Sequence, residues 1–403
     1  TGSSPTGGKT KLTFARDVFP VLQEHCIECH RSGEIGPFSM ERYDEIVGWA
    51  DTMMETIDDG RMPPWHADPE IGTFANARHM PRADRELLRE WIDTGAEAGD
   101  LGSLPEARNY ATGWQFGREP DLVLPMRDRP FTVPRDGIVE YQYFVVDPGF
   151  EEDRWVESAQ VMPGSRDVVH HAIVFVRPPD GSRMNGVGWL TAYVPGQRAL
   201  APPSGHARRI PAGSKLVFQM HYTPVGAERK DTSRVGLVFA DVSQVTHELV
   251  SYAALEQEFE IPPQTSAHPV RASLSSIPKG GQLLGVTPHM HYRGTSFQLF
   301  SDPKRAPPGQ AEHSTLLSVP NYDFNWQHTY LFDKPLDLGS IEKLWFEATF
   351  DNSASNPFNP DPSEWVTWGD QTWEEMALAF FEVALPRTSD SDDRQLASEN
   401  ESS

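Results

Sequence analysis

Hydrophobic residues recur at helical spacing only near the N-terminus of the chain. Apolar positions three and four apart run through Ser39–Asp59 up to Gly60, and again through Arg82–Thr94 up to Gly95. Phe14–His25 has the same character. A one-faced apolar stripe closed by glycine is typical of an amphipathic helix. We therefore expect a small helical domain at the N-terminus.

The pattern changes after Gly99–Arg118, a segment rich in proline, glycine and charge. Short runs of β-branched and aromatic residues follow, separated by Pro/Gly turns and not interrupted by any amphipathic run of helix length. These runs are Gly137–Val146, Val168–Val176, Lys215–Tyr222 and Val235–Phe239. They predict an antiparallel β-sandwich or barrel, and a second strand-rich segment begins near residue 266.

A chain of 403 residues is too long for one ordinary domain. We expect an all-α domain over residues 1–112, antiparallel β-sandwiches over 113–265 and 266–385, and an acidic, disordered tail over 386–403. The Gly/Ser/Thr-rich residues 1–10 are typical of a disordered leader at the start of a processed or trimmed chain.

Charge narrows the classes of partner. The chain has 35 basic and 58 acidic residues, a net charge of -23, which argues against nucleic acid and anionic membrane surfaces. No apolar run approaches the length needed to span a bilayer. The two cysteines are three positions apart, so disulfides do not hold this chain together.

Those two cysteines lie in Cys26-Ile27-Glu28-Cys29-His30, the attachment pattern of c-type haem. One helical turn presents both thiols to the two vinyl groups, and the following histidine faces the iron. A zinc site would need two more soft ligands, and the chain has no other cysteine. A redox dithiol would sit in a βαβ pattern, which is missing here. We predict one covalent haem c per chain.

A second haem ligand is expected after the second helix. Met62 lies in Gly60–Trp65, which resembles the Met-Pro loop that brings the axial methionine to haem in small class I cytochromes c. Such a thioether raises the haem potential. Met62 is the preferred ligand, a core methionine is the ordinary alternative, and His66, His79 and Met80 could compete for the same position.

His170 and His171 are adjacent inside the strand-like run Val168–Val176. Neighbouring strand residues point to opposite faces, so both rings reach one metal only if the strand is bulged, twisted or ending, or if one coordinates through Nδ1 and the other through Nε2. Period-two alternation places Gln219 and His221 on one face, and His221 is the candidate third imidazole. Half-buried histidines with ordinary hydrogen bonds are the alternative.

A later pattern repeats this chemistry. His289 and His291 flank one residue, which puts both rings on one face of a strand. Met376 follows two glutamates, and beside histidines its thioether would select copper, especially Cu(I), over zinc; packing is the usual role of a lone methionine. The polar segment Asn321–Tyr330, with His328 as a further candidate ligand, could line a cleft.

Three other features have simpler readings. Asp351-Asn352-Ser353 could also line a cleft but is equally explained as a turn. His206 and His247 are expected on the surface.

The ordered set H-H, Q-x-H-Y, H-x-H-x-x-G and E-E-M, over about residues 120–385, resembles the copper type II, ascorbate-dependent monooxygenases. Dopamine β-monooxygenase and the peptidylglycine α-hydroxylating enzyme are the best-known members. The resemblance implies two consecutive antiparallel sandwiches, each with one copper, facing across a cleft. It assigns His170, His171 and His221 to an electron-transfer copper. It assigns His289, His291 and Met376 to the copper where O₂ and substrate meet, and places Gln219 near the first copper.

The chain departs from the family in two ways. The disulfides of the vertebrate members are missing, so the cores hold by packing and strand pairing. The side chains that grip the substrate carboxylate in the peptide-amidating enzyme are replaced here by Thr287, Leu378 and Phe380. We therefore expect a neutral small substrate, unless Arg293, the nearest arginine in sequence, supplies the charge.

Together these features predict a dicopper monooxygenase that inserts one atom of O₂ into a substrate C–H bond. An external redox carrier or an ascorbate-like reductant would supply electrons through the fused haem. Thioether attachment of haem occurs outside the cytoplasm, so we expect a periplasmic or secreted protein. The alternative is a non-catalytic copper-binding electron-transfer protein, which needs the histidines but no substrate cleft.

Overall fold

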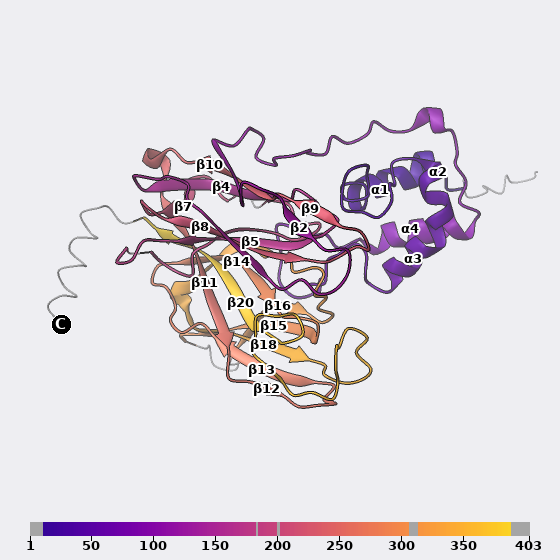
Figure 1. Cartoon of the computed structure of the whole chain (residues 1–403). Coiled ribbons are helices and arrows are strands. Elements are labelled where there is room, and N and C mark those ends of the chain that lie inside the picture. The colour runs from indigo at the N-terminus through magenta and orange to yellow at the C-terminus, as the bar shows by residue number, and fades with distance from the viewer. Residues whose placement is uncertain (1–10, 183, 200–201, 306–312, 388–403) are drawn as a thin grey trace, which may run out of the picture. The chain divides into compact units, whose positions relative to one another are not determined.

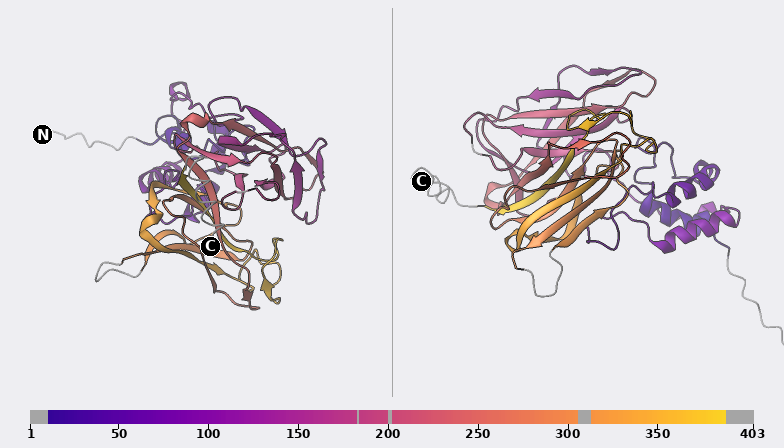
Figure 2. Two further views of the ribbon diagram at one scale, coloured as in Figure 1. Left: turned by 90° about the vertical axis from the view of Figure 1, so that its left-hand side faces the viewer. Right: turned by 90° about the horizontal axis from the view of Figure 1, so that it is seen from below.

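The computed structural model describes residues 11–182, 184–199, 202–305 and 313–387. Within them the chain is mainly β-structure and divides into two compact units (Figures 1 and 2). The first unit is Thr1–Trp65 with Arg78–Ala111, and the second is His66–Ala77 with Thr112–Ser403. Residues 66–77, which the sequence assigns to the helical domain, therefore belong with the strands. None of the described helices is long and apolar enough to cross a membrane.

The first unit is helical and has no strand among its described residues. It consists of a π-helical turn (Phe14–Val18), α1 (Phe19–His25), α2 (Tyr43–Ile46), a 3₁₀ turn (Val47–Trp49), α3 (Ala50–Asp58), α4 (Arg82–Asp93) and a 3₁₀ turn (Leu101–Ser103). Its core is built on fully buried Phe14, Leu22, Leu88 and Trp91. Helix α4 follows the predicted stripe and ends before Gly95, whose φ of 100° only glycine adopts without strain.

The helix expected over Ser39–Asp59 is broken. It starts at Tyr43, and the 3₁₀ turn Val47–Trp49 separates α2 from α3. Gly48 at the centre of this turn is a poor helix former. Trp49 at the end of this turn is exposed and stacks on Phe38, with ring centroids 5.0 Å apart.

The second unit contains all the named strands of the described chain. An eight-stranded sheet has the order β1 (Leu122–Pro125), β10 (Arg234–Phe239), β4 (Arg154–Met162), β7 (His206–Ile210), β11 (His247–Glu256), β20 (Ala377–Pro386), β14 (Gln282–His289) and β17 (Tyr330–Asp337). A four-stranded sheet has the order β3 (Gln142–Val146), β8 (Lys215–Tyr222), β5 (Val169–Arg177) and β6 (Trp189–Tyr193).

A second four-stranded sheet has the order β13 (His268–Ser273), β18 (Ile341–Phe350), β15 (Gly294–Pro303) and β16 (Ser314–Val319). Two-stranded ribbons pair β2 (Phe131–Val133) with β9 (Arg229–Asp231) and β12 (Glu260–Ile261) with β19 (Val366–Thr367). Short 3₁₀ turns lie at Val242–Gln244 and Leu338–Ser340.

The two halves of the second unit share the eight-stranded sheet. Strand β11 pairs along its length with β20, which lies between β11 and β14 (yellow in Figure 1). β11 also pairs with β7, in parallel, over two residue pairs. Since β11 falls within 113–265, the strands do not divide at the expected boundary near residue 265; the halves meet between β7 and β11.

Packing on β8 decides which side chains face the site. Phe218, Met220 and Tyr222 enter the core that β5 and β8 share with β4 and β10. Alternation then turns Gln219 and His221 to the other face, as predicted. The observed β8 matches the expected strand, whereas β3 begins at Gln142, five residues later than the pattern indicated.

Candidate metal centre

The adjacent histidines lie on a β-bulge of β5. Val169 pairs with Tyr222 and His171 pairs with His221 on β8, so the register shifts and His170 is the extra residue. A bulge re-aims a side chain that regular alternation would send to the opposite face. An irregular strand is one of the two arrangements expected to bring both imidazoles together, and a bulge is present here.

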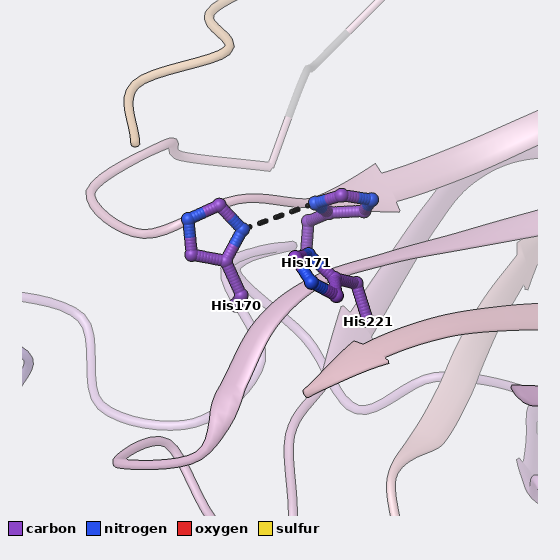
Figure 3. A group of neighbouring side chains, drawn as sticks. All are labelled: His170, His171 and His221. Carbon is purple, nitrogen blue, oxygen red and sulfur yellow. Dashed lines mark hydrogen bonds between the residues drawn. The ribbon is translucent and has the colours of Figure 1, made fainter. Parts of the chain in front are cut away.

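His170, His171 and His221 form a compact group (Figure 3). One ring nitrogen from each lies within 4.8 Å of those of the other two. The His221 ring centroid is 4.9 Å from that of each partner. The Nδ1 atoms of His170 and His171 face each other at 3.2 Å, the dashed line in Figure 3. A single metal ion could bind all three rings.

Other side chains hold the far nitrogens of two of these rings. His170 Nε2 lies 3.3 Å from Asn325 Oδ1, and His171 Nε2 lies 3.2 Å from the Tyr141 hydroxyl. The Tyr141 ring also stacks on His221 at 5.0 Å. The buried Nδ1 of His221 has no hydrogen-bond partner in the described part of the chain. These outer hydrogen bonds orient the rings of His170 and His171, and Nδ1 of His221 is available to a metal.

In the second histidine pair the protein binds the Nδ1 atoms, whereas in the first group it binds Nε2 atoms. His289 ends β14 and His291 lies just beyond it, with ring centroids 5.3 Å apart and planes at 88°. His289 Nδ1 lies 2.5 Å from Gln327 Oε1, and His291 Nδ1 lies 3.2 Å from the backbone oxygen of Glu374. Nε2 of fully buried His291 has no hydrogen-bond partner among the described residues. Here Nε2 of His291 is available to a metal.

Glu375 fixes the backbone around this pair. Its buried carboxylate accepts hydrogen bonds from the backbone N–H groups of His291 (2.8 Å), Arg293 (2.6 Å) and Met376 (3.3 Å). Met376 immediately precedes β20. The carboxylate therefore joins the two segments that carry the predicted ligands His291 and Met376. Burial raises the pKa of Glu375 to about 8, although the same N–H groups oppose this.

The segment between β16 and β17 touches both histidine sets. Phe324 stacks on His170, with ring centroids 4.9 Å apart, and lies edge-on to His291 at 6.0 Å. The Tyr322 hydroxyl accepts a hydrogen bond from the Met290 backbone N–H and donates one to its carbonyl. With Asn325 and Gln327 this places the polar segment Asn321–Tyr330 beside the predicted ligands.

The two sets adjoin at His171 and His289, whose ring centroids are 6.3 Å apart. A small chamber of about 20 Å³ lies beside these two rings and is also lined by Gln327, Thr287 and Phe380, among others. That volume holds about one water-sized molecule. The resemblance implies two coppers facing across a cleft, whereas here the five histidines form one continuous cluster.

Burial keeps the cluster neutral. It lowers the pKa of His221 to about 3, with His170 and His289 adding to the effect, and it lowers the pKa of His289 to about 4. The pKa values of His171 and His291 fall well below the usual value, first by burial and then by their imidazole neighbours. Neutral imidazole is the form that binds metals.

The predicted haem-attachment residues Cys26, Cys29 and His30 form one turn in the first unit. The backbone N–H groups of Cys29 and His30 donate to the Cys26 carbonyl, at 3.1 and 2.9 Å. His30 is buried, and its Nδ1 lies 3.2 Å from the Phe38 carbonyl, which leaves Nε2 for an iron. The backbone at Gly36 passes so close to this turn that a Cβ added to Gly36 would lie 2.7 Å from the Cys29 carbonyl oxygen. Neither cysteine forms a disulfide.

The candidate sixth ligands fall in different places. Met62 and Met80 are half-buried against the same core as Cys26. His79 is exposed, and His66 belongs to the second unit. The structure thus keeps Met62 and Met80 as the two candidates that share this core with the attachment cysteine.

Several other candidates have different partners. Gln219 donates to the Tyr143 hydroxyl at 2.9 Å. His328 is buried, with its ring stacked on Trp326 at 6.2 Å. Arg293 is buried and donates to Asn352 Oδ1 and the Trp373 carbonyl, at 2.8 Å each, so it is not available as a substrate clamp.

His206 and His247, expected as separate surface histidines, instead stack on each other with ring centroids 4.6 Å apart and are half-buried. They pair where β7 meets β11, which explains why they lie together. Asp351–Ser353 forms a turn in which Asn352 accepts from Arg293.

Comparisons with known proteins name no family. No protein-family model and no curated protein matches the chain. Among solved structures, the major capsid protein P2 from bacteriophage PM2 has a TM-score of 0.32 at 9% identity, covering 67% of this chain and 98% of that one. The STIV MCP has a TM-score of 0.27 at 8% sequence identity, and the match covers 66% of this chain and 95% of that one. Allantoicase has a TM-score of 0.18 at 11% sequence identity, and the match covers 56% of this chain and 81% of that one. These likenesses are too weak to assign a fold or a function.

Tyr141, Phe324 and Asn325 are the site residues that sequence reasoning missed. Tyr141 was placed within a predicted strand but has no motif of its own. Phe324 and Asn325 lie in the polar segment Asn321–Tyr330, yet a stacking ring and an amide carry no spacing signal. Asn325 contacts a histidine 155 positions away.

Proposed function

We propose that this chain is a dicopper monooxygenase of the class its ordered histidine motifs resemble. The observation that supports this most is the convergence of five histidines from β5, β8 and the end of β14 into one buried cluster. Unpartnered ring nitrogens in a buried cluster are costly unless a ligand binds them.

The two histidine sets have separate roles in this proposal. His170, His171 and His221 hold one copper, and His289, His291 and Met376 hold the other, where a thioether favours Cu(I). Bound copper supplies the one-electron steps and the activation of O₂. The chain contributes fixed ring orientations, through Tyr141, Asn325 and Gln327, and a chamber of about 20 Å³ beside His171 and His289.

The proposed reaction converts a C–H bond to C–OH. One atom of O₂ enters the product and the other leaves as water, which consumes two electrons and two protons. The external donor, a redox carrier or an ascorbate-like reductant, supplies the electrons, and the helical unit relays them as a class I-like cytochrome c. Cys26 and Cys29 attach its haem, and His30 and Met62 are the axial ligands. The site of haem attachment makes the protein periplasmic or secreted.

Composition is the first test. The purified protein should contain two coppers and one covalent haem per chain, measured by metal analysis and by haem retention in acidified organic solvent. His171→Ala should lose copper. His206→Ala, in a histidine pair outside the cluster, is the matched control and should keep both coppers. Zinc in a four-coordinate site, or haem that the solvent releases, would contradict the proposal.

Oxygen uptake separates an enzyme from the alternative, a non-catalytic copper electron-transfer protein. Copper-loaded protein is given a reductant and O₂ with a panel of neutral candidate substrates. A monooxygenase consumes one O₂ per hydroxylated product. Reduction of O₂ to peroxide alone, unchanged by every candidate, supports the electron-transfer protein instead.

A further inference from the structure

A larger cavity continues from the chamber beside the histidines. It has a volume of about 280 Å³ and lies within the second unit. The cavity and the chamber share lining residues, including Trp189, Thr287 and Phe380. Small-molecule sites span roughly 300 to 1,000 Å³, so this cavity suits a small ligand.

The middle of the cavity is apolar. The rings of Trp189 on β6 and Phe380 on β20 lie 4.4 Å apart at the inner end. Leu284, Leu331 and Phe332 add further apolar wall from β14 and β17. Such a lining favours an aromatic or branched aliphatic body.

The polar groups at the inner end are neutral and already paired. The hydroxyls of Thr287 and Thr329 lie 2.7 Å apart, and the Thr329 backbone N–H donates to Gln197 Oε1 at 3.2 Å. Thr287 stands at one of the positions where the peptide-amidating enzymes carry their carboxylate clamp. Thr287 and Thr329 carry no charge at this end of the cavity.

The remote part of the lining carries one ion pair. Arg208 on β7 binds Glu382 on β20, and each side chain is only 15% exposed. Ser251 Oγ donates to Glu382 and accepts from Arg208, both at 3.2 Å. A carboxylate ligand would have to displace Glu382 from Arg208, and an ammonium would have to displace Arg208 from Glu382. Breaking a largely buried pair is costly, so either ion is disfavoured.

An exposed acidic residue of the lining also disfavours the entry of anions into the cavity. Glu157 and Asp333 are exposed residues of the cavity lining. Glu157 is paired with Arg118 at 3.8 Å, whereas the Asp333 carboxylate repels an approaching anion.

We infer that this cavity binds an uncharged substrate with an apolar body and one neutral hydrogen-bonding head, such as a primary amide or an alcohol. The head meets Arg208, Ser251 and Glu382, and the far end of the body lies at Thr287 beside the histidines. This inference rests on the proposed function, because it places the C–H bond to be oxidised at the inner end. It commits the site to a substrate class that the motifs alone do not specify.

The test is calorimetric binding to the oxidised, copper-loaded full chain without reductant, so that no turnover occurs. Three probes share one body: 3-phenylpropanamide, 3-phenylpropanoate and 3-phenylpropylammonium. The amide should bind about tenfold or more tightly than either ion, because each ion leaves a buried charge without its partner. Equal binding of all three probes would overturn the inference.

Two variants locate the binding. Glu382→Gln frees Arg208, so the carboxylate should gain about tenfold in affinity relative to the amide. Glu347→Gln, at the Arg271–Glu347 surface pair (2.6 Å), is the matched control and should leave the preference unchanged. Leu284→Phe narrows the apolar wall and should weaken all three probes. Should Glu382→Gln fail to fold, a folded Leu284→Phe with unchanged amide affinity is sufficient to reject the cavity.

The outcomes also separate this inference from the proposed function. Selective amide binding without any hydroxylated product leaves the cavity assignment standing and removes the monooxygenase. Hydroxylation at the wild-type rate in folded Leu284→Phe and Glu382→Gln would support the monooxygenase proposal and reject the cavity as the substrate site.

Discussion

Four of the five histidines of the cluster have at least one ring nitrogen hydrogen-bonded to the protein, whereas His221 Nδ1 and His291 Nε2 have no hydrogen-bond partner among the described residues. Asn325 and Tyr141 bind Nε2 of His170 and His171, while Gln327 binds Nδ1 of His289. Outer hydrogen bonds of this kind set the tautomer and the ring orientation. The protein's hydrogen bonds therefore occupy Nε2 of His170 and His171 but Nδ1 of His289, although the side chains are chemically identical.

The same residues predict how the copper-free protein responds to acid. Unfolded histidines titrate near pH 6.5, whereas burial lowers the pKa of His221 to about 3 and that of His289 to about 4. Between these values the unfolded chain binds more protons than the folded one. The free energy of unfolding should therefore fall as the pH falls below about 6.5, by up to about 1.4 kcal/mol per pH unit for each such histidine.

Urea unfolding of the copper-free protein at several pH values between 7.5 and 5 measures this slope. His221→Gln should reduce it by up to one proton, because glutamine does not titrate. An unchanged slope in that variant would show that the buried cluster is not the origin of the acid sensitivity.

Met376 is predicted to serve one copper alone. Met376→Ala should abolish hydroxylation while haem and the three-histidine copper remain, because a thioether removed from one site leaves the other ligand set intact. Copper content should fall from two to about one per chain. Met162→Ala, whose sulfur accepts from Arg234 at 3.6 Å on β4, is the matched control. Full activity in Met376→Ala would refute the assignment of the second copper.

At the residue scale the sequence was a good guide where local geometry controls the outcome. Alternation allows the histidine doublet to share a metal through an irregular strand or through different ring nitrogens, and the structure has a bulge there. Alternation also separates His221 from the core residues of β8. Tyr141 and Phe324 could not be predicted, because their roles depend on contacts between strands and loops distant in sequence.

At the element scale, one loop connects the two ligand sets. The segment between β16 and β17 contributes Phe324 and Asn325 to the first set and Gln327 to the second. Its Tyr322 hydroxyl holds the backbone between the paired histidines through Met290. A loop with this many contacts acts as a rigid part of the site. The polar residues between strands predicted its position, and the strand topology decided its partners.

Gln327→Leu tests this loop. The change leaves His289 Nδ1 without its 2.5 Å partner but keeps the side-chain volume. Loss of such a partner lowers metal affinity by roughly 10- to 100-fold. Copper titration should show weaker binding at the His289–His291–Met376 set only, and the three-histidine set should be unchanged.

The control for that experiment is Gln219→Leu. Gln219 shares a face of β8 with His221, but its side chain donates to Tyr143. It should leave both copper affinities within experimental error of the wild type. Equal losses in the two variants would mean that the effect is general destabilisation.

At the scale of the whole molecule, the chain passes between its two units three times, after Trp65, after Ala77 and after Ala111. Sequence periodicity located the change from helix to strand near residue 112, because the repeat of apolar positions itself changes there. It did not locate residues 66–77, where Asn76 pairs with the backbone of Thr329 and Leu331. A short segment without a periodic pattern carries no signal of its packing partner.

This connectivity bears on how the proposed coppers would be reduced. One turnover of the proposed reaction would need two electrons from outside, and two coppers would store only two, so the coppers would have to be reduced again in each cycle. Residues 66–77 follow Met62 closely in sequence and pack within the second unit. A carrier joined covalently to its acceptor acts at an effective concentration of about millimolar or more. We therefore predict that the haem reduces the copper of His170, His171 and His221 directly.

Rapid mixing of haem-reduced, copper-oxidised protein tests this final prediction. Haem absorbance should report reoxidation without O₂, with an amplitude proportional to the copper loaded, because each Cu(II) accepts one electron. His171→Ala should stop the reaction by removing the acceptor, whereas Met376→Ala should leave the first electron transfer intact because it alters the other set. A cytochrome that only docks or stabilises would stay reduced until O₂ arrives, or would reoxidise equally fast in copper-free protein. Either result would reject a direct electron path from the haem to the copper.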